Sequence, residues 1–285
     1  MHGLPGEFVY VRCRHCGLVY QNPQLTPDEL APFYPGDYGA HREGGRRRIP
    51  VLGFLDKDTR IESRCRAVMR YASGGRVLDV GCATGTFLEG MRRRGWEVRG
   101  VEPSARAAAL CRQKLGLEVQ ASTLDAAQLE SASFNLVTMW NVLEHVNDPQ
   151  QTLRRVHDVL RPGGLLVAAV PNTESLDIRV FGRYWAGYDV PRHLFVFTPE
   201  NLTRMVEAAG LEVISRRCVS GTYRAFAFNL RFLMRDRVRN RYLCAAATRL
   251  VVARPTRLLL MPLSRLLDML GRGTITTWVC RKKLR

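Results

Sequence analysis

The stretch that decides the fold is RVLDVGCATGTF, residues 76–87, and VRGVE follows at residues 98–102. An apolar strand pattern leads directly into a turn bracketed by Gly81 and Gly85, and a helical pattern begins after the turn. A second short strand then ends on Glu102. Such a unit places bare backbone N–H groups at a helix N-terminus and an acid about 20 residues further on, where a ribose diol can bind. The pattern predicts a site for a nucleoside cofactor.

The glycine spacing argues against a dinucleotide. The three glycine positions of the dinucleotide fingerprint fall on Gly81, Ala83 and Thr86, and only the first is glycine. A pyrophosphate needs the second glycine for close approach of the backbone and the third for close packing of the helix. A nicotinamide or flavin dinucleotide therefore fits this turn badly.

The motif that does stand here is Asp79-x-Gly81-x-x-x-Gly85. It resembles the first motif of the class I S-adenosylmethionine-dependent methyltransferases, and Glu102 stands at their ribose-binding position. The resemblance implies an α/β fold with a doubly wound, mostly parallel, seven-stranded sheet and S-adenosylmethionine as cofactor. The amino-acid end of this cofactor suits the glycine turn, its ribose suits Glu102, and its adenine suits the loop after the third strand. The cofactor-binding residues that the resemblance implies are Asp79, Gly81, Cys82, Ala83, Gly85, Glu102, Thr123, Leu124 and Asn141.

The downstream segments follow the order of this family, which argues against an ordinary turn in an unrelated α/β protein. Asp148-Pro149 and Thr198-Pro199 are expected helix starts, because Asp and Thr cap a helix N-terminus and proline suits its first position. Residues 143–149 resemble the LEHxxDP motif of one branch of this family. Asn135 stands where that branch usually carries Asp, and we expect Asn135 to be structural. The expected strands cover residues 117–121, 134–139, 165–170, 211–219 and 274–280, the last of them antiparallel by resemblance.

The N-terminal segment contains Cys13-x-x-Cys16-Gly17, which is half of a zinc ribbon. Tetrahedral zinc needs four ligands, and the second half of the motif is missing. We expect a vestigial knuckle held by apolar packing, and a metal bound by Cys13 and Cys16 is the alternative. The expected organisation is a separate zinc-ribbon-like unit at 1–40, an exposed linker and a lid helix at 41–73, a cofactor-binding core at 74–221, a basic helical insertion at 222–272 and the final strand at 273–285.

The net charge of +17 is concentrated near the C-terminus. Residues 222–285 carry thirteen Arg and two Lys against Asp236 and Asp268, a net charge of +13, so all other residues contribute +4. Two helical stretches are expected in the insertion, the second with a leucine stripe at residues 259, 263, 266, 267 and 270. Three roles compete: contact with an anionic membrane, binding of nucleic acid, and a cap over the acceptor pocket or a dimer face.

Composition sets the remaining bounds. A chain of 285 residues with 46% hydrophobic content has room for one α/β domain and appendages. The N-terminus lacks a signal-peptide pattern, and no run of about 18 apolar residues is present. The eight scattered cysteines are then most simply reduced thiols. We expect a cytoplasmic protein, and peripheral contact at the inner face of the membrane is the alternative that the membrane role of the insertion implies; its oligomeric state stays open.

Methyl transfer requires a nucleophile held in line with the methyl group and, often, a base that removes a proton. Candidate bases follow the fourth and fifth strands, where open α/β sheets bind ligands. His193 is the first candidate, because by resemblance the segment 185–193 lies over the acceptor pocket; His145 is the second, with Glu144 as its orienting partner. We expect O-methylation of a small-molecule, sugar or lipid-linked acceptor. The alternatives are an inactive cofactor-binding assembly protein and an RNA-directed methyltransferase.

Overall fold

The computed structural model describes residues 7–34, 57–218, 222–238 and 240–284. Within the expected linker and lid-helix segment at 41–73, residues 41–56 lie outside the described residues. The chain forms two units. We call residues 34–169, 203–215 and 278–285 the sheet unit, and residues 1–33, 170–202 and 216–277 the helical unit.

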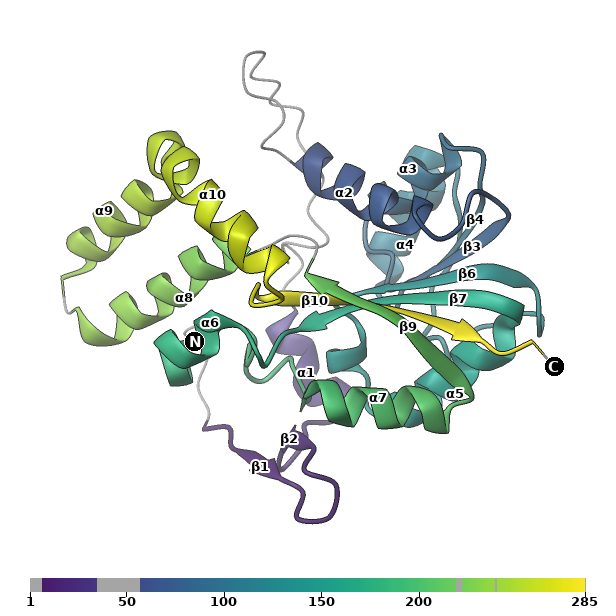
Figure 1. The fold of residues 1–285 in the computed structure, drawn as a ribbon, viewed down its shortest axis with the longest axis horizontal. Coiled ribbons are helices and arrows are strands. Elements are labelled where there is room, and N and C mark those ends of the chain that lie inside the picture. Colours follow the sequence, from purple (N-terminus) through teal and green to yellow (C-terminus); the bar gives the residue numbers. More distant parts are fainter. Residues whose placement is uncertain (1–6, 35–56, 219–221, 239, 285) are drawn as a thin grey trace. The chain divides into compact units, whose positions relative to one another are not determined.

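A seven-stranded sheet has the order β5-β4-β3-β6-β7-β10-β9. The pairs β5–β4, β4–β3, β3–β6 and β6–β7 are parallel, and Figure 1 shows β10 running opposite to β7 and β9. This topology confirms the predicted fold class. Val80 lies opposite both Val101 and Met139, so the carboxyl ends of β3, β4 and β6 lie side by side. The strands are β3 (Arg76–Val80), β4 (Glu97–Val101), β5 (Glu118–Gln120), β6 (Phe134–Trp140), β7 (Leu160–Pro171), β9 (Leu211–Cys218) and β10 (Ile275–Lys282).

Helices cover both faces of this sheet. Figure 1 shows α2, α3 and α4 on one side and α5 on the other. The predicted helix starts are confirmed, because Asp148 accepts the Gln151 N–H at 2.9 Å and Thr198 accepts the Asn201 N–H at 3.2 Å. The helices are α2 (Lys57–Met69), α3 (Thr86–Arg92), α4 (Ala105–Leu115), α5 (Pro149–Val159) and α7 (Pro199–Ala208), with the 3₁₀ turn η3 (Leu143–His145).

The start of β7 differs from the prediction. The strand begins at Leu160 rather than at 165, because Leu160 pairs with Phe134 before an irregularity at the Pro-Gly-Gly segment. Asn135 lies in the same corner, and its Oδ1 accepts the Arg76 N–H at 2.9 Å and Arg161 Nη1 at 3.2 Å. The structural role expected for Asn135 is confirmed.

The helical unit contains a second, three-stranded sheet of order β1-β2-β8, in which Tyr20 pairs with Phe195. The expectation that residues 1–40 stand apart is therefore wrong, because their strands complete a sheet with a segment far along the chain. The strands are β1 (Tyr10–Arg12), β2 (Val19–Gln21) and β8 (Phe195–Val196). The short helices are α1 (Pro27–Leu30), η1 (Ala31–Phe33), α6 (Leu176–Phe181) and η4 (Gly182–Tyr184).

The insertion forms three helices, where the sequence predicted two. They are α8 (Thr222–Arg237), α9 (Arg241–Val252) and α10 (Arg254–Met269). The predicted first stretch breaks at Asn240, whose side chain caps α9, and Pro255 lies in the first turn of α10. Each of the three helices contacts the other two (Figure 1).

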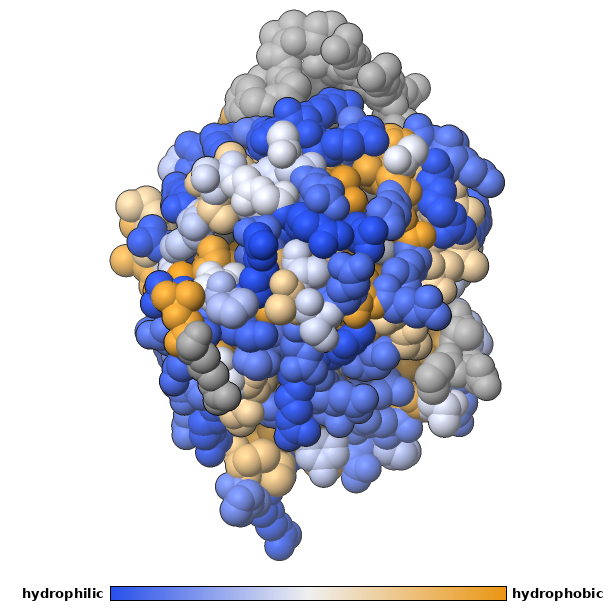
Figure 2. Space-filling model, turned by 90° about the vertical axis from the view of Figure 1, so that its right-hand side faces the viewer, coloured by the Kyte–Doolittle hydropathy of each residue, from blue (hydrophilic) through white to orange (hydrophobic). Residues whose placement is uncertain are grey.

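The surface drawn in Figure 2 is mostly hydrophilic, with separate hydrophobic spots. All eight cysteines are free thiols. Among the residues that the structure describes, every helix is too short or too polar to cross a lipid bilayer.

Candidate functional site

The glycine turn after β3 alternates through left-handed backbone conformations at Gly81, Ala83 and Gly85, with φ of 67°, 51° and 71°. A Cβ on Gly81 would lie 2.7 Å from Val142 Cγ2, and a Cβ on Gly85 would lie 2.7 Å from Leu117 Cδ1. Both positions therefore require glycine for space as well as for conformation. Ala83 holds a conformation that costs a non-glycine residue about 1–2 kcal/mol, a strain that is common at ligand sites.

The prediction that this turn presents bare N–H groups is wrong for four of its residues. Gly81 and Cys82 donate to the Val101 carbonyl at 2.7 and 3.2 Å, and Gly85 donates to Cys82 O at 2.9 Å. Ala83 N donates to Glu102 Oε2 at 2.8 Å. The turn closes against the end of β4, which consumes the donors that a phosphate would use. This arrangement is a second argument against a pyrophosphate.

Three buried carboxylates occur at the carboxyl ends of the adjacent strands β4, β3 and β6. Glu102 follows β4, Asp79 lies near the end of β3, and Glu144 lies in η3 after β6. Glu102 Oε1 accepts the Ser104 N–H at 2.9 Å, which fixes the carboxylate against the turn. Buried negative charge favours a cationic ligand with hydroxyl groups and opposes a pyrophosphate.

Asp79 is held in the middle of the sheet. The Thr138 hydroxyl donates to Asp79 Oδ1 at 2.6 Å. Burial raises the pKa of Asp79 to about 7, while the Thr138 hydrogen bond and the Arg64 charge oppose the rise. A carboxyl group with this pKa gains a proton near neutrality unless a cation binds beside it. The motif therefore contains a charge that a cationic cofactor can stabilise.

Trp140 ends β6 between two helices. Arg64 of α2 lies with Cζ 4.7 Å from the centroid of the Trp140 ring, and the Phe87 ring of α3 lies 5.3 Å away. Trp140 Nε1 is buried and has no hydrogen-bond acceptor among the described residues. A buried N–H normally has a partner, so an orphan beside the cofactor turn fits a site that a ligand completes. Sequence reasoning missed Arg64 and Trp140, since no local motif distinguishes them.

The remaining predicted cofactor residues lie in the same sheet unit. Leu124 is buried and Thr123 is exposed in the loop after β5, and Asn141 follows β6 with φ of 60°. Asn141 Nδ2 donates to Glu144 Oε1 at 3.1 Å. The Cys82 side chain packs as a small hydrophobe, since a Cβ on Gly100 would lie 2.8 Å from its sulfur. Contact with the Cys111 thiol, together with burial, raises the pKa of Cys82 far above its usual range.

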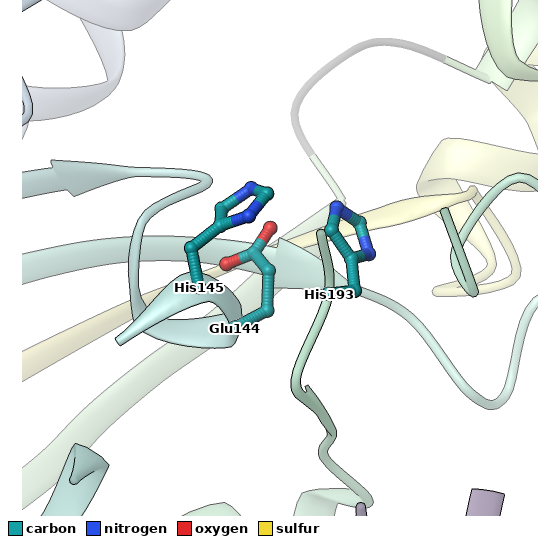
Figure 3. A group of neighbouring side chains, drawn as sticks. All are labelled: Glu144, His145 and His193. Atoms are coloured by element: carbon teal, nitrogen blue, oxygen red, sulfur yellow. The ribbon is translucent and has the colours of Figure 1, made fainter. Parts of the chain in front are cut away.

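The candidate base His145 belongs to the sheet unit. Figure 3 draws Glu144 and His145 on η3, the turn that follows β6. The Tyr34 hydroxyl lies 3.1 Å from His145 Nδ1. His145 is half-buried and Glu144 is fully buried. Glu144 Oε1 accepts the hydrogen bond from Asn141, and the predicted role of Glu144 in orienting a histidine stays a prediction.

The candidate base His193 belongs to the helical unit, on the loop before β8 (Figure 3). Its Nδ1 lies 2.7 Å from the Gly187 carbonyl, and its Nε2 lies 3.7 Å from Asp189 Oδ2. The Tyr10 hydroxyl lies 2.6 Å from the carbonyl oxygens of both Tyr188 and His193. Burial raises the pKa of Tyr10, so this hydroxyl stays a donor. The N-terminal strand thus braces the His193 loop, a role that the sequence did not reveal.

Two further buried polar side chains, those of Gln21 and Trp185, lie beside this loop. Gln21 donates its backbone N–H to Leu194 O at 2.9 Å, and its buried side-chain amide has no hydrogen-bond partner among the described residues. Trp185 Nε1 is buried and equally lacks an acceptor within that part of the chain. A Cβ on Gly187 would lie 2.2 Å from the Trp185 ring, so glycine is required there. Sequence reasoning missed Gln21, which belongs to no motif.

The backbone of the segment from Cys13 to Gly17 forms the predicted knuckle. Gly17 N donates to Cys13 O at 2.9 Å, and backbone N–H groups of Cys16 and His15 lower the pKa of the Cys13 thiol. In the described ranges no third histidine, cysteine or carboxylate joins Cys13 and Cys16 as a ligand cluster. Binding of a metal by these two thiols stays an untested alternative.

Comparison with known proteins places this geometry in a family. Residues 58–216 match a family model described as a methyltransferase domain. The chain belongs to the class I S-adenosylmethionine-dependent methyltransferases. The ubiquinone biosynthesis O-methyltransferase of Ruegeria pomeroyi is 32% identical over 178 residues, which cover 59% of this chain and 69% of that protein.

Solved structures share the fold of this methyltransferase. A methyltransferase from Thermotoga maritima is 21% identical, with a TM-score of 0.52 over 81% of this chain and 92% of that one. The [4+2]-cyclase SpnF is 20% identical, with a TM-score of 0.53 over 78% and 81%. Since the same fold occurs in a methyltransferase and in a cyclase, the fold alone does not set the reaction. The family match supports an enzyme that uses S-adenosylmethionine and argues against the alternative of an inactive assembly protein.

Proposed function

We propose that this methyltransferase methylates a hydroxyl group of a small-molecule or lipid-linked acceptor, with His193 as general base. The observation that carries the proposal is the 2.7 Å contact between His193 Nδ1 and the Gly187 carbonyl. A carbonyl oxygen only accepts a hydrogen bond, so Nδ1 is the donor, and in the neutral imidazole Nε2 is then the nitrogen with the lone pair. That lone pair can take the proton of an acceptor hydroxyl.

The residues around His193 support this role. When bound, S-adenosylmethionine supplies a methyl group already activated by the sulfonium, so the protein has to position the acceptor and remove its proton. The Asp189 carboxylate, 3.7 Å from Nε2, stabilises the positive imidazole that proton transfer creates. Tyr10 holds the backbone on both sides of the loop and is a positioning residue.

The buried polar groups of the loop favour a polar acceptor. The Gln21 amide offers both a donor and an acceptor, and Trp185 Nε1 offers a donor. An acceptor that carries hydroxyl groups satisfies such groups, whereas an apolar acceptor leaves them unpaired at a cost of about 1–3 kcal/mol each. The Ruegeria pomeroyi relative is an O-methyltransferase, which agrees with a hydroxyl acceptor.

The test is transfer of labelled methyl from S-adenosylmethionine to catechol, a nucleotide sugar and an aliphatic amine as probes. We expect His193→Ala to lower kcat by about 10²- to 10⁴-fold and added imidazole to restore part of it. S-adenosylhomocysteine affinity should stay unchanged. His145→Ala is the matched control and should retain kcat within a few-fold. Full turnover by the His193 variant, or transfer to the amine alone, contradicts the proposal.

The acceptor side has its own test. Gln21→Leu should raise the KM of the hydroxyl probe by about tenfold, which corresponds to one lost hydrogen bond, without changing S-adenosylhomocysteine affinity. Tyr10→Phe should lower kcat and leave that affinity alone. An equal loss of cofactor affinity in both variants would show general unfolding of the loop, and would remove Gln21 from the acceptor side.

A further inference from the structure

The helix α10 exposes an almost wholly apolar surface. Four leucines of its predicted stripe are exposed: Leu259, Leu263, Leu266 and Leu270 have exposed fractions of 78, 53, 50 and 64%. The fifth, Leu267, is half-buried. Leu258 and Met269 add exposed fractions of 45 and 84%. At 100° per residue, these six side chains span an arc of about 140°. We call these six residues the α10 face.

The opposite side of α10 packs within the three-helix group. Leu260, Ser264 and Asp268 lie on that side and are only partly exposed, and α10 contacts both α8 and α9. A period-3.6 apolar stripe normally points into a core. Here the helix has its packed side elsewhere, so the α10 face is left for something outside the helical unit.

The neighbouring helix α9 also exposes bulky apolar side chains. Tyr242, Leu243 and Leu250 have exposed fractions of 72, 58 and 66%. Arg249 is exposed on α9, and Arg265 is exposed at the edge of the α10 face. The exposed positions of α9 and α10 thus include both bulky apolar side chains and arginines.

The net charge of the insertion indicates which kind of partner the α10 face binds. Residues 222–272 contain eleven arginines and two aspartates, a net charge of +9. Asp236 pairs with Arg183 at 2.9 Å, and Asp268 lies on the packed side of α10, so neither carboxylate belongs to the α10 face. A second copy of the chain would meet this charge with like charge. A nucleic-acid site would need arginines and aromatic rings at these positions, whereas the α10 face carries leucines and a methionine.

We propose that α9 and α10 dock the protein onto the surface of an anionic lipid bilayer, with the α10 face inserted among the acyl chains. Apolar insertion supplies part of the affinity, and the surrounding arginines interact with the lipid headgroups. Because both contributions act together, binding requires the leucines and weakens as salt screens the arginines. This binding does not depend on the identity of the acceptor or of the base.

The experiment is co-sedimentation of the full chain with vesicles of phosphatidylcholine alone or with about one-third phosphatidylglycerol. We expect binding to the anionic vesicles that falls at least tenfold when salt is raised to about 1 M. Leu259→Asp/Leu263→Asp/Leu266→Asp should weaken binding by at least a hundredfold. Arg249→Gln/Arg265→Gln should weaken it by about tenfold or more.

The matched control is Leu284→Asp, which changes an 80% exposed leucine outside the three helices and should bind as the wild type does. Far-UV circular dichroism and S-adenosylhomocysteine binding check that all variants fold, as expected for substitutions at exposed positions. Equal vesicle binding by the triple variant and the wild type overturns the proposal. The proposal is also overturned if the wild type does not bind the vesicles, whether it dimerises through the α10 face or binds a single-stranded RNA instead.

Discussion

Replacement of Asp79 by Asn should change the way in which stability depends on pH. Asp79 has an unfolded pKa near 3.8 and a folded pKa of about 7, raised by burial. The folded state therefore binds this proton more tightly than the unfolded state does. For such a group, stability is greatest below the unfolded pKa and is lost as pH rises toward the folded pKa. The isosteric Asp79→Asn variant keeps an oxygen for the Thr138 hydroxyl and has nothing to titrate.

The size of the effect follows from the two pKa values. Between about pH 5 and pH 8, the wild type should lose about 3 kcal/mol of unfolding free energy relative to the Asp79→Asn variant. Urea unfolding of both proteins across this range measures the difference, in which every other titrating group cancels. If the difference in unfolding free energy between the two proteins changes by less than about 1 kcal/mol across this pH range, the reasoning is refuted.

A second variant tests the cause of the shift. The Thr138 hydroxyl donates to Asp79 Oδ1 and holds the pKa of Asp79 below the value that burial alone would give. Thr138→Val should therefore raise this pKa and move the loss of stability to higher pH. A transition at unchanged pH would show that the hydrogen bond does not act on Asp79 as the structure indicates.

Three further predictions concern the turn and its frame. Gly85→Ala should cost about 3 kcal/mol, because it adds overlap with Leu117 to backbone strain, whereas Gly95→Ala, with φ of 82° and nothing within 4 Å, should cost about 1 kcal/mol; thermal unfolding compares them. Asn135→Ala should cost about 1–2 kcal/mol by removing the acceptor of the Arg76 N–H, and Asn135→Asp should keep the stability, which urea unfolding can measure. Glu102→Ala should weaken S-adenosylhomocysteine binding by about a hundredfold in calorimetry, with unchanged binding as the contrary result.

The sheet and its caps could be predicted because their signals are local. The run at 76–87 contains strand, turn and helix together, and Asp148 and Thr198 act on donors three residues away. The pairing of Tyr20 with Phe195 joins residues far apart in the chain, and no local sequence pattern predicts this pairing. The prediction for the N–H groups of the turn was wrong for a related reason, since Gly81 and Cys82 donate to Val101 on the next strand and Ala83 donates to Glu102 just after that strand.

The candidate site was predictable only in part. The motif residues Asp79, Glu102 and Asn141 lie at the ends of adjacent strands, as the sequence predicted. Arg64 and Gln21 depend on how a helix and a distant strand pack, which periodicity does not encode. The leucine stripe of α10 was visible as a pattern, but its exposure is a property of what surrounds the helix.

The central claim is that the corner made by the glycine turn and Glu102 binds an adenosyl sulfonium cofactor. Calorimetric titration of the purified chain with S-adenosylmethionine, S-adenosylhomocysteine and a nicotinamide dinucleotide tests it most directly. We predict saturable binding of the first two compounds and none of the third. Heat from the dinucleotide alone would contradict the account.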